Sequence, residues 1–166
     1  MSRTHTVIAS PVGDLLAVAE GGTLCGLYFE GHLRGPGPGE WGARDDADFT
    51  EVRRQLGEYF AGPRTRFDLP LAPRGNEFQQ RVWRLLTEIP FGETRTYGDL
   101  ARHLGDASLA QAVGSANARN PISVIVPCHR VVGADGGLTG YAGGLDRKRF
   151  LLDLEEPAER KAARLF

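Results

Sequence analysis

The feature that most constrains the fold of this chain is a short apolar run, residues 122–126, that leads directly into Pro127 and Cys128. A run of this kind predicts a buried strand. Pro127 would end the strand, because proline has no N–H to donate to a ladder. Cys128 is therefore expected where a buried strand stops and a turn begins, a position that can present one side chain to a pocket.

Cys128 can be interpreted in two ways. It is either a reactive thiol, whose pKa a neighbouring base or cation would lower, or an inert buried cysteine. His129 follows it directly and is the candidate base. An adjacent Cys-His pair does not decide between these interpretations, because nucleophilic catalysis usually needs a third group that orients the base.

The first part of the chain predicts a small sheet with one helix. Apolar alternation favours strands, and apolar residues at helical spacing favour an amphipathic helix. Cys25 falls within a predicted strand and is interpreted as a buried structural residue. The expected elements are a hairpin over residues 4–9 and 14–19, a strand over 24–29, a loop over 31–42, a helix over 48–60 and a short strand over 67–71.

The second part, from residue 76 onward, predicts mainly helices. Thr96 and Asp99 have the spacing of a capping box, and Ser108 with Gln111 has a similar spacing before a helix over 109–119. Two helices joined by a short turn that contains Gly105 are typical of a helix-turn-helix.

The end of the chain predicts one more helix. Asp146 is expected to cap it and Glu155 to lie at its end, while the charged residues 156–166 are expected to fray. The predicted fold class is therefore α+β. A small sheet-and-helix support domain, residues 1–75, is followed by a mostly helical domain of winged-helix or helix-turn-helix type, residues 76–166.

A gapped string around Cys128 is far more specific than any four-residue motif. It consists of Asn120-Pro121, PCHRVVG at 127–133 and LTGYAGG at 138–144, with FQQRVW, IPFG and TYG upstream and Lys148 and LLDLE downstream. This string closely resembles the active-site region of the O6-alkylguanine-DNA alkyltransferases. That family repairs alkylated guanine in DNA by taking the alkyl group onto its own cysteine.

The resemblance implies a catalytic set and a substrate pocket. Cys128 would be the nucleophile and final acceptor, His129 the base acting through a bridging water, and Glu155 the carboxylate that orients the histidine. Asn120 would tie the preceding helix to the active-site turn. Ala142 stands where some members carry serine, which leaves only its backbone N–H for O6 of the base. The implied substrate-binding residues are Tyr97, Val131, Tyr141 and Ala142.

The resemblance also implies that the second helix of the helix-turn-helix enters the minor groove of DNA, whose narrow width of roughly 6 Å suits a slim helix. Gln111 stands where the family usually carries an arginine that fills the gap left by an extruded nucleotide. Taken by themselves, the small residues of this helix equally fit tight packing against a neighbouring helix. The implied DNA-binding residues are Ala110, Gln111, Ala112, Gly114, Ser115, Arg119 and Arg130.

The function implied is DNA repair by a single-turnover methyltransferase. It would flip O6-alkylguanine, mainly O6-methylguanine, out of duplex DNA and transfer the alkyl group irreversibly and stoichiometrically to Cys128. One alternative is a non-catalytic protein that binds or senses alkylated DNA, although such relatives lack the reactive cysteine. A cysteine hydrolase is the other, but it leaves the helix-turn-helix unexplained. The preferred alkyl group, and activity on O4-alkylthymine, stay open.

Composition and charge add limits to this interpretation. The formal net charge is −1, so DNA contact must rely on a local patch rather than on a basic excess. No apolar stretch is long enough to span a membrane and no signal peptide is evident, which favours a cytoplasmic protein. We expect a monomer, with cooperative binding on DNA left open, and no cofactor. Zinc is not expected, because Cys25, His5 and His32 are scattered.

Overall fold

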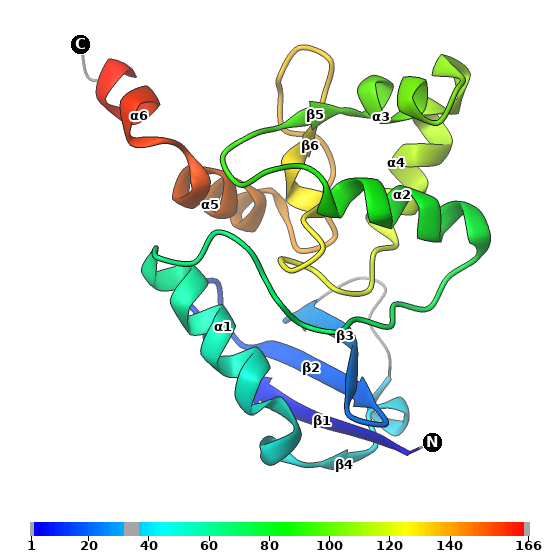
Figure 1. Ribbon diagram of the computed structural model, residues 1–166, viewed down its shortest axis with the longest axis vertical. Helices are drawn as coiled ribbons and strands as arrows, with labels where there is room; N and C mark the ends of the chain where they lie inside the picture. Colours follow the sequence, from blue (N-terminus) through cyan, green and yellow to red (C-terminus); the bar gives the residue numbers. More distant parts are fainter. Residues whose placement is uncertain (1, 32–36, 165–166) are drawn as a thin grey trace.

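The computed structural model describes residues 2–31 and 37–164, and it confirms the expected α+β class. Figure 1 shows a sheet with helix α1 in one half of the molecule and the remaining helices in the other half. The connecting segment after α1 runs between the two halves. Residues 32–36, which include His32 and part of the expected loop, lie outside the described residues.

The sheet has four strands in the order β3-β2-β1-β4. The hairpin predicted from the sequence is confirmed, with β1 antiparallel to β2 and Ile8 opposite Leu15. The two-residue strand β4, which the sequence did not indicate, pairs in parallel with β1. The strands are β1 (Arg3–Ile8), β2 (Leu15–Glu20), β3 (Thr23–Phe29) and β4 (Ala43–Arg44).

The free edge of β3 connects the sheet to the rest of the chain. Ala72 N–H donates to Leu24 O at 2.8 Å, and Leu27 N–H donates to Pro121 O at 2.8 Å. The expected strand over 67–71 is wrong, because only Leu71 forms an isolated bridge to β3. Edge strands carry unpaired backbone groups. Here Ala72, in the segment after α1, and the turn that begins at Pro121 satisfy several of these groups.

Helix α1 (Thr50–Ala61) confirms the amphipathic helix and follows two short 3₁₀ turns, η1 (Pro38–Glu40) and η2 (Asp46–Phe49). Val52, Leu56 and Tyr59 are buried on its inner face. The helix ends at Gly62, whose φ of 111° is a left-handed conformation that glycine adopts without a steric penalty.

Helices α2 (Glu77–Thr87), α3 (Tyr97–His103) and α4 (Ala110–Ala118) form the helical half. The capping box of Thr96 and Asp99 is confirmed at the start of α3. The expected cap by Ser108 is wrong: Asp106 accepts from Ser108 N–H at the 3₁₀ turn η3 (Ala107–Leu109), which runs on into α4. Trp83 Nε1–H donates to Ala116 O at 2.9 Å and packs α2 against α4.

The remaining elements are the 3₁₀ turn η4 (Cys128–Arg130), strands β5 (Arg95–Thr96) and β6 (Val131–Val132), and helices α5 (Leu145–Glu155) and α6 (Ala158–Arg164). Two expectations are wrong here. Gly144 is the N-cap of α5, with Asp146 in its first turn, and most of the segment expected to fray is helix α6. Within the described ranges, no helix combines the length and apolar character needed to cross a bilayer.

Candidate active site

The apolar run before Cys128 is buried, as expected, but it is not a strand. Residues 122–126 form a compact turn in which Val124 has a φ of 71°. This left-handed conformation is strained for a β-branched residue and persists only when its surroundings fix it. Asn120 provides that fixation: its side chain accepts from Ile122 N–H at 3.0 Å and donates to Val126 O at 2.8 Å. The start of the run still meets the sheet, since Ser123 N–H donates to Leu27 O of β3 at 3.0 Å, and the Asn120 side chain closes the turn that follows.

Cys128 begins the 3₁₀ turn η4 and is 4% exposed. Burial raises the pKa of its thiol above the ordinary value, and Asn120, Tyr141 and Lys148 oppose that rise. The resting thiol is therefore protonated at neutral pH. Asn117 on α4 donates to the backbone carbonyl of Cys128 at 3.3 Å, which connects this helix directly to the cysteine.

His129 is fully buried, and its two ring nitrogens have different surroundings. Nε2 lies 2.8 Å from Glu155 Oε2, whereas Nδ1 has no hydrogen-bond partner among the described residues. Burial lowers the pKa of His129 although Glu155 opposes this, so the ring is neutral at neutral pH. The ionised carboxylate has no proton to give. Nε2 must therefore carry the proton, which leaves a lone pair on Nδ1.

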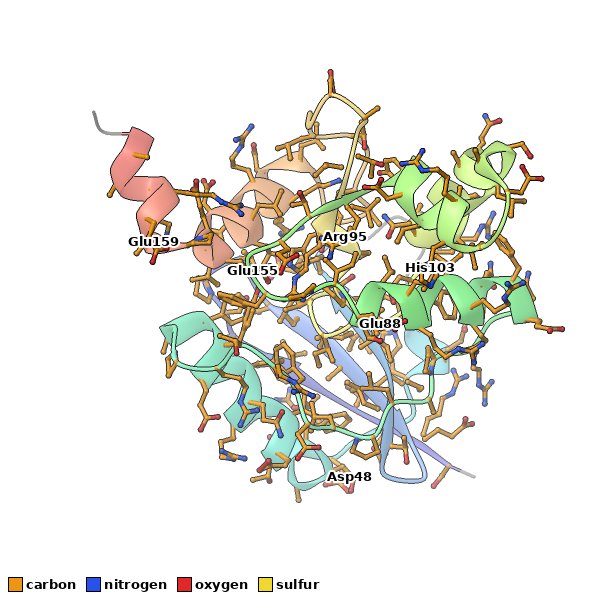
Figure 2. All side chains as sticks on the ribbon, turned by 45° about the horizontal axis from the view of Figure 1, so that its top comes forward. Asp48, Glu88, Arg95, His103, Glu155 and Glu159 are labelled. Carbon is orange, nitrogen blue, oxygen red and sulfur yellow. The ribbon has the colours of Figure 1, made fainter. Side chains whose placement is uncertain are left out.

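Glu155 lies at the end of α5 with 2% exposure, inside the molecule, whereas Glu159 on α6 lies at the periphery (Figure 2). Burial alone would raise the pKa of Glu155, but His129 and Arg130 outweigh it and lower that pKa to about 2. Arg130 binds the carboxylate through Nε at 2.8 Å and Nη2 at 3.0 Å. Tyr59 on α1 donates its hydroxyl proton to Oε2 at 2.5 Å.

Arg130, which was expected to contact DNA, lies inside the protein. Its side chain is 8% exposed, and Nη1 also donates to Ile89 O at 2.6 Å. The guanidinium is thus used inside the protein, where it neutralises the buried charge of Glu155. A phosphate could reach it only after this pair had been broken.

Of the four residues expected to bind the substrate, Val131 donates its N–H to the Cys128 carbonyl and Tyr141 lies beside the Cys128 thiol. Val131 is buried, and Tyr97, Tyr141 and Ala142 are half-buried. The Tyr97 hydroxyl lies 2.8 Å from Thr139 Oγ1, and the Tyr141 hydroxyl is buried beside the Cys128 thiol without a well-aligned hydrogen bond. The buried ammonium of Lys148 donates to Val131 O at 2.7 Å and to Thr139 O at 3.1 Å. Lys148 thus joins two walls of the site.

Arg147 fixes the segment that carries Tyr141. Its guanidinium donates to Val12 O and Glu30 O, each at 2.9 Å, and to Gly143 O at 3.2 Å. It also lies over the ring of Phe29, 5.2 Å from the centroid, and Phe29 in turn packs against Tyr141 with ring centroids 5.8 Å apart. The sheet half of the molecule therefore supports one wall of the site.

The expected DNA-binding residues of α4 fall into two groups. Gln111, Ala112, Ser115 and Arg119 are exposed, whereas Ala110 and Gly114 are half-buried. A Cβ at Gly114 would lie 3.7 Å from the ring of Tyr97, so this position faces the pocket tyrosine. One side of α4 packs inward, as tight packing requires, and the other side is exposed, so DNA contact through the exposed side stays a prediction.

Three residues around the site carried no functional role in the sequence interpretation: Tyr59, Asn117 and Lys148. Tyr59 lies on the apolar face of its helix, which predicts a core residue, and Asn117 carried no signal in the sequence. Their partners, Glu155 and Cys128, are known only from the structure. Lys148 belonged to the family-like string, but its burial could not be foreseen from a charged helix. Among the described residues, no group of three or more His, Cys, Asp or Glu side chains could hold a metal ion.

Comparison with known families gives two adjoining matches. Residues 4–73 match the family described as 6-O-methylguanine DNA methyltransferase, ribonuclease-like domain. Residues 77–157 match 6-O-methylguanine DNA methyltransferase, DNA binding domain. Together the two matches cover most of the chain and include every residue of the site described above.

Individual proteins agree with these matches. The methylated-DNA–protein-cysteine methyltransferase of Methanosarcina acetivorans is 51% identical over 152 residues, which cover 91% of this chain and 97% of the relative. The enzyme of the same name from Mycobacterium tuberculosis is 48% identical over 152 residues, with 92% of each chain covered. The chain belongs to the 6-O-methylguanine DNA methyltransferase family, and its activity is that of a methylated-DNA–protein-cysteine methyltransferase.

Solved structures extend the agreement to the whole fold. The M. tuberculosis O6-methylguanine methyltransferase superposes with a TM-score of 0.86 at 45% identity, covering 96% of this chain and 98% of that one. A structure of the M. tuberculosis protein OGT in complex with DNA gives a TM-score of 0.88 at 48% identity, with 92% of each chain covered.

Proposed function

We propose that this protein repairs O6-alkylguanine, mainly O6-methylguanine, in duplex DNA by moving the alkyl group irreversibly onto Cys128. The observation that carries the proposal is the state of His129: its Nε2–H is bound to an ionised carboxylate, and its Nδ1 is buried and has no hydrogen-bond partner among the described residues, while the buried thiol of Cys128 is its neighbour in the sequence. A nucleophile, a base and an orienting carboxylate are thus available together: Cys128 and His129 are adjacent in the sequence, and His129 binds Glu155.

Activation of the thiol follows from this arrangement. The proton of Cys128 passes through a bridging water to Nδ1 of His129, and Glu155 stabilises the imidazolium that forms. Lys148 and the Asn120 amide lower the pKa of the thiol against the effect of burial, so they favour the thiolate as it develops. Asn120 also holds the turn that presents the sulfur.

Transfer is then a displacement at the alkyl carbon. The sulfur lone pair forms the S–C bond while the C–O6 bond breaks, and the released electron pair goes to the purine, which takes up a proton as guanine. Tyr97 supplies a hydrogen bond to the purine, and Val131, Tyr141 and the backbone at Ala142 hold the base. The product thioether has no ordinary cellular reductant, so each molecule reacts once. A free thiol acceptor fits a reducing, cytoplasmic setting.

The base must leave the duplex to reach Cys128, at a cost of a few kcal/mol. In the proposal a monomer, made of a support domain 1–75 and a DNA-binding domain 76–166, places the exposed side of α4 in the minor groove. Gln111, Ala112, Ser115 and Arg119 provide its contacts, with Ala110 and Gly114 at its inner border. Gln111 occupies the space left by the flipped nucleotide.

The test is to count repaired bases per protein molecule. An excess of duplex with O6-methylguanine is incubated with the protein, and the digested DNA is analysed for remaining O6-methylguanine. We expect loss to stop at one equivalent, to be absent in Cys128→Ser and to persist in Cys25→Ser, since Cys25 is buried in β3. Many equivalents would indicate a hydrolase instead. No loss, with the DNA still bound, would indicate a damage-binding protein.

A further inference from the structure

Tyr59 belongs to the sheet half of the molecule but reaches the catalytic centre of the other half. It lies on α1 with 0% exposure, and its hydroxyl donates to Oε2 of Glu155, 96 positions away in the sequence, at 2.5 Å. A buried tyrosine usually finds a partner for its hydroxyl, so burial alone would explain a hydrogen bond. The partner atom, however, is Oε2 of Glu155, the same oxygen that lies against His129, and this indicates a role in the catalytic centre.

Oε2 is the oxygen that orients the candidate base. It receives Tyr59 O–H, lies 2.8 Å from His129 Nε2 and accepts from Arg130 Nη2 at 3.0 Å, whereas Oε1 accepts from Arg130 Nε. Arg130 holds the carboxylate as a whole through both oxygens. Tyr59 acts on the one oxygen that contacts the histidine, so it affects both the position of His129 and the charge that His129 faces.

The Tyr59 ring is fixed by aromatic neighbours. Phe60, Phe67 and Phe91 surround it, with ring centroids 5.2, 5.3 and 6.2 Å away. Phe91 also lies under the guanidinium of Arg130, at 5.9 Å. Burial and the neighbouring carboxylate raise the pKa of Tyr59, so the hydroxyl keeps its proton and can only donate it in a hydrogen bond to Glu155.

We propose that Tyr59 is a positioning residue of the alkyl transfer: its hydroxyl fixes Oε2 of Glu155, and through it the ring of His129, so that the unpartnered Nδ1 stays free to take up the thiol proton. The inference rests on the proposed function, because it assumes that His129 is the base. It assigns the sheet half a direct part in the chemistry, where the sequence indicated only support.

The effect of removing this hydroxyl has a definite sign. The charged groups that act on His129 are Glu155 and Lys148 of α5 and Arg130 of its own turn. Tyr59 of α1 contacts Glu155, and the Tyr141 hydroxyl lies beside the Cys128 thiol. Without the Tyr59 proton, the charge on Oε2 is less compensated and holds an imidazolium more tightly. A protonated His129 cannot accept the thiol proton. On acidification, the transfer rate of a protein without this hydroxyl should therefore fall at a higher pH than the rate of the native protein.

The experiment compares Tyr59→Phe with the native protein in single-turnover transfer from an O6-methylguanine duplex, across pH and well below the melting temperature. We expect the rate constant at neutral pH to fall about tenfold, as for loss of one hydrogen bond to a charged group. The acid limb should move to higher pH, and affinity for the duplex should not change.

Val52→Ala is the matched control, because Val52 is buried on the same helix and does not touch Glu155. It should lower the melting temperature and leave the rate constant and the acid limb as they are. If Tyr59→Phe does not fold, 3-fluorotyrosine at position 59 replaces it: this stronger donor of similar size should move the acid limb to lower pH.

The outcomes separate the inference from the function on which it rests. If the native protein transfers no methyl group, the proposed function fails and the role of Tyr59 fails with it. The second outcome is that the native protein transfers the methyl group normally and Tyr59→Phe has the same rate constant and acid limb as Val52→Ala. Tyr59 then only joins the sheet half to the helical half, and the inference is overturned while the proposed function stands. An unmoved acid limb with 3-fluorotyrosine would likewise overturn it.

Discussion

The buried cluster around Glu155 and the open side of α4 represent two ways of building function into one chain. In the cluster, Tyr59, His129, Arg130 and Glu155 are all buried and come from three separate elements, α1, η4 and α5. On α4, Gln111, Ala112, Ser115 and Arg119 are neighbours on one short helix and face solvent. Under the proposed function, the chemistry and the DNA contact are separable: changes in the cluster should disturb the fold, and changes on α4 should not.

The largest expected effect is that of Glu155→Gln. The substitution leaves the buried guanidinium of Arg130 without its counter-charge, which typically costs about 3–5 kcal/mol of stability. It also removes the group that orients His129, so transfer should slow strongly. Urea unfolding and single-turnover kinetics measure the two effects. Unchanged stability with a normal transfer rate would contradict the role of the cluster.

Acid should weaken the cluster in a defined pH window. The pKa of Glu155 is lowered from 4.5 to about 2 in the folded protein, so the folded state binds its proton less tightly than the unfolded chain does. The stability it contributes is fully present above pH 4.5 and is lost as pH falls toward 2. His129, whose pKa is also lowered, adds a loss that begins below its ordinary value of 6.5.

Urea midpoints measured at a series of pH values check this window. The native protein should lose stability steadily below pH 6.5. Glu155→Gln should lose less than the native protein between pH 4.5 and 2, because the group that titrates there has been removed. Parallel curves for the two proteins over that interval would show that Glu155 is not held ionised by its partners.

A smaller effect is expected from the reaction itself. Cys128 is 4% exposed, and an added S-methyl group must fit among Asn120, Tyr141 and Val131. Overpacking of a close-packed interior costs about 1–3 kcal/mol. Thermal unfolding before and after reaction with O6-methylguanine DNA should therefore show a lower melting temperature for the alkylated protein. An unchanged melting temperature would mean that the pocket accepts the methyl group without strain.

The smallest effect on the fold is expected on α4. Gln111 is exposed, so Gln111→Arg should change the free energy of unfolding by no more than about 0.5 kcal/mol. The substitution adds one positive charge to the exposed side of α4, which is proposed to contact DNA. Affinity for duplex DNA should rise, and the slope of log K against log salt should steepen by about 0.9. Ala47→Arg, on the far 3₁₀ turn η2, is the control for charge alone.

The sequence predicted what depends on neighbours along the chain. The hairpin, α1, the Thr96 capping box and helix α4 follow local rules of alternation, periodicity and capping. The same rules failed at residues 122–126, because only Ile122 and Ser123 meet strand β3, and the side chain of Asn120 then bonds to Ile122 N–H and Val126 O across a turn. They failed again at Ser108, where Asp106 two positions earlier is the better placed acceptor.

The site could be predicted only in part. Family resemblance placed Cys128, His129 and Glu155 together, but the periodicity of α5 alone gives Glu155 no reason to be buried. Its burial follows from Arg130 and Tyr59, and no local pattern predicts contacts across 25 and 96 positions. Arg130 was assigned to DNA for the same reason, because an arginine beside an active-site turn carries no sequence signal that it points inward.

The most direct test of the central claim is to locate the transferred group. The protein is incubated with a duplex that carries O6-methylguanine, and its intact mass and peptide masses are then measured. Transfer to the buried thiol predicts a gain of one methyl group per chain, mapped to Cys128, with Cys25 unmodified. An unchanged mass while the DNA remains bound, or a methyl group on any other residue, would contradict the account.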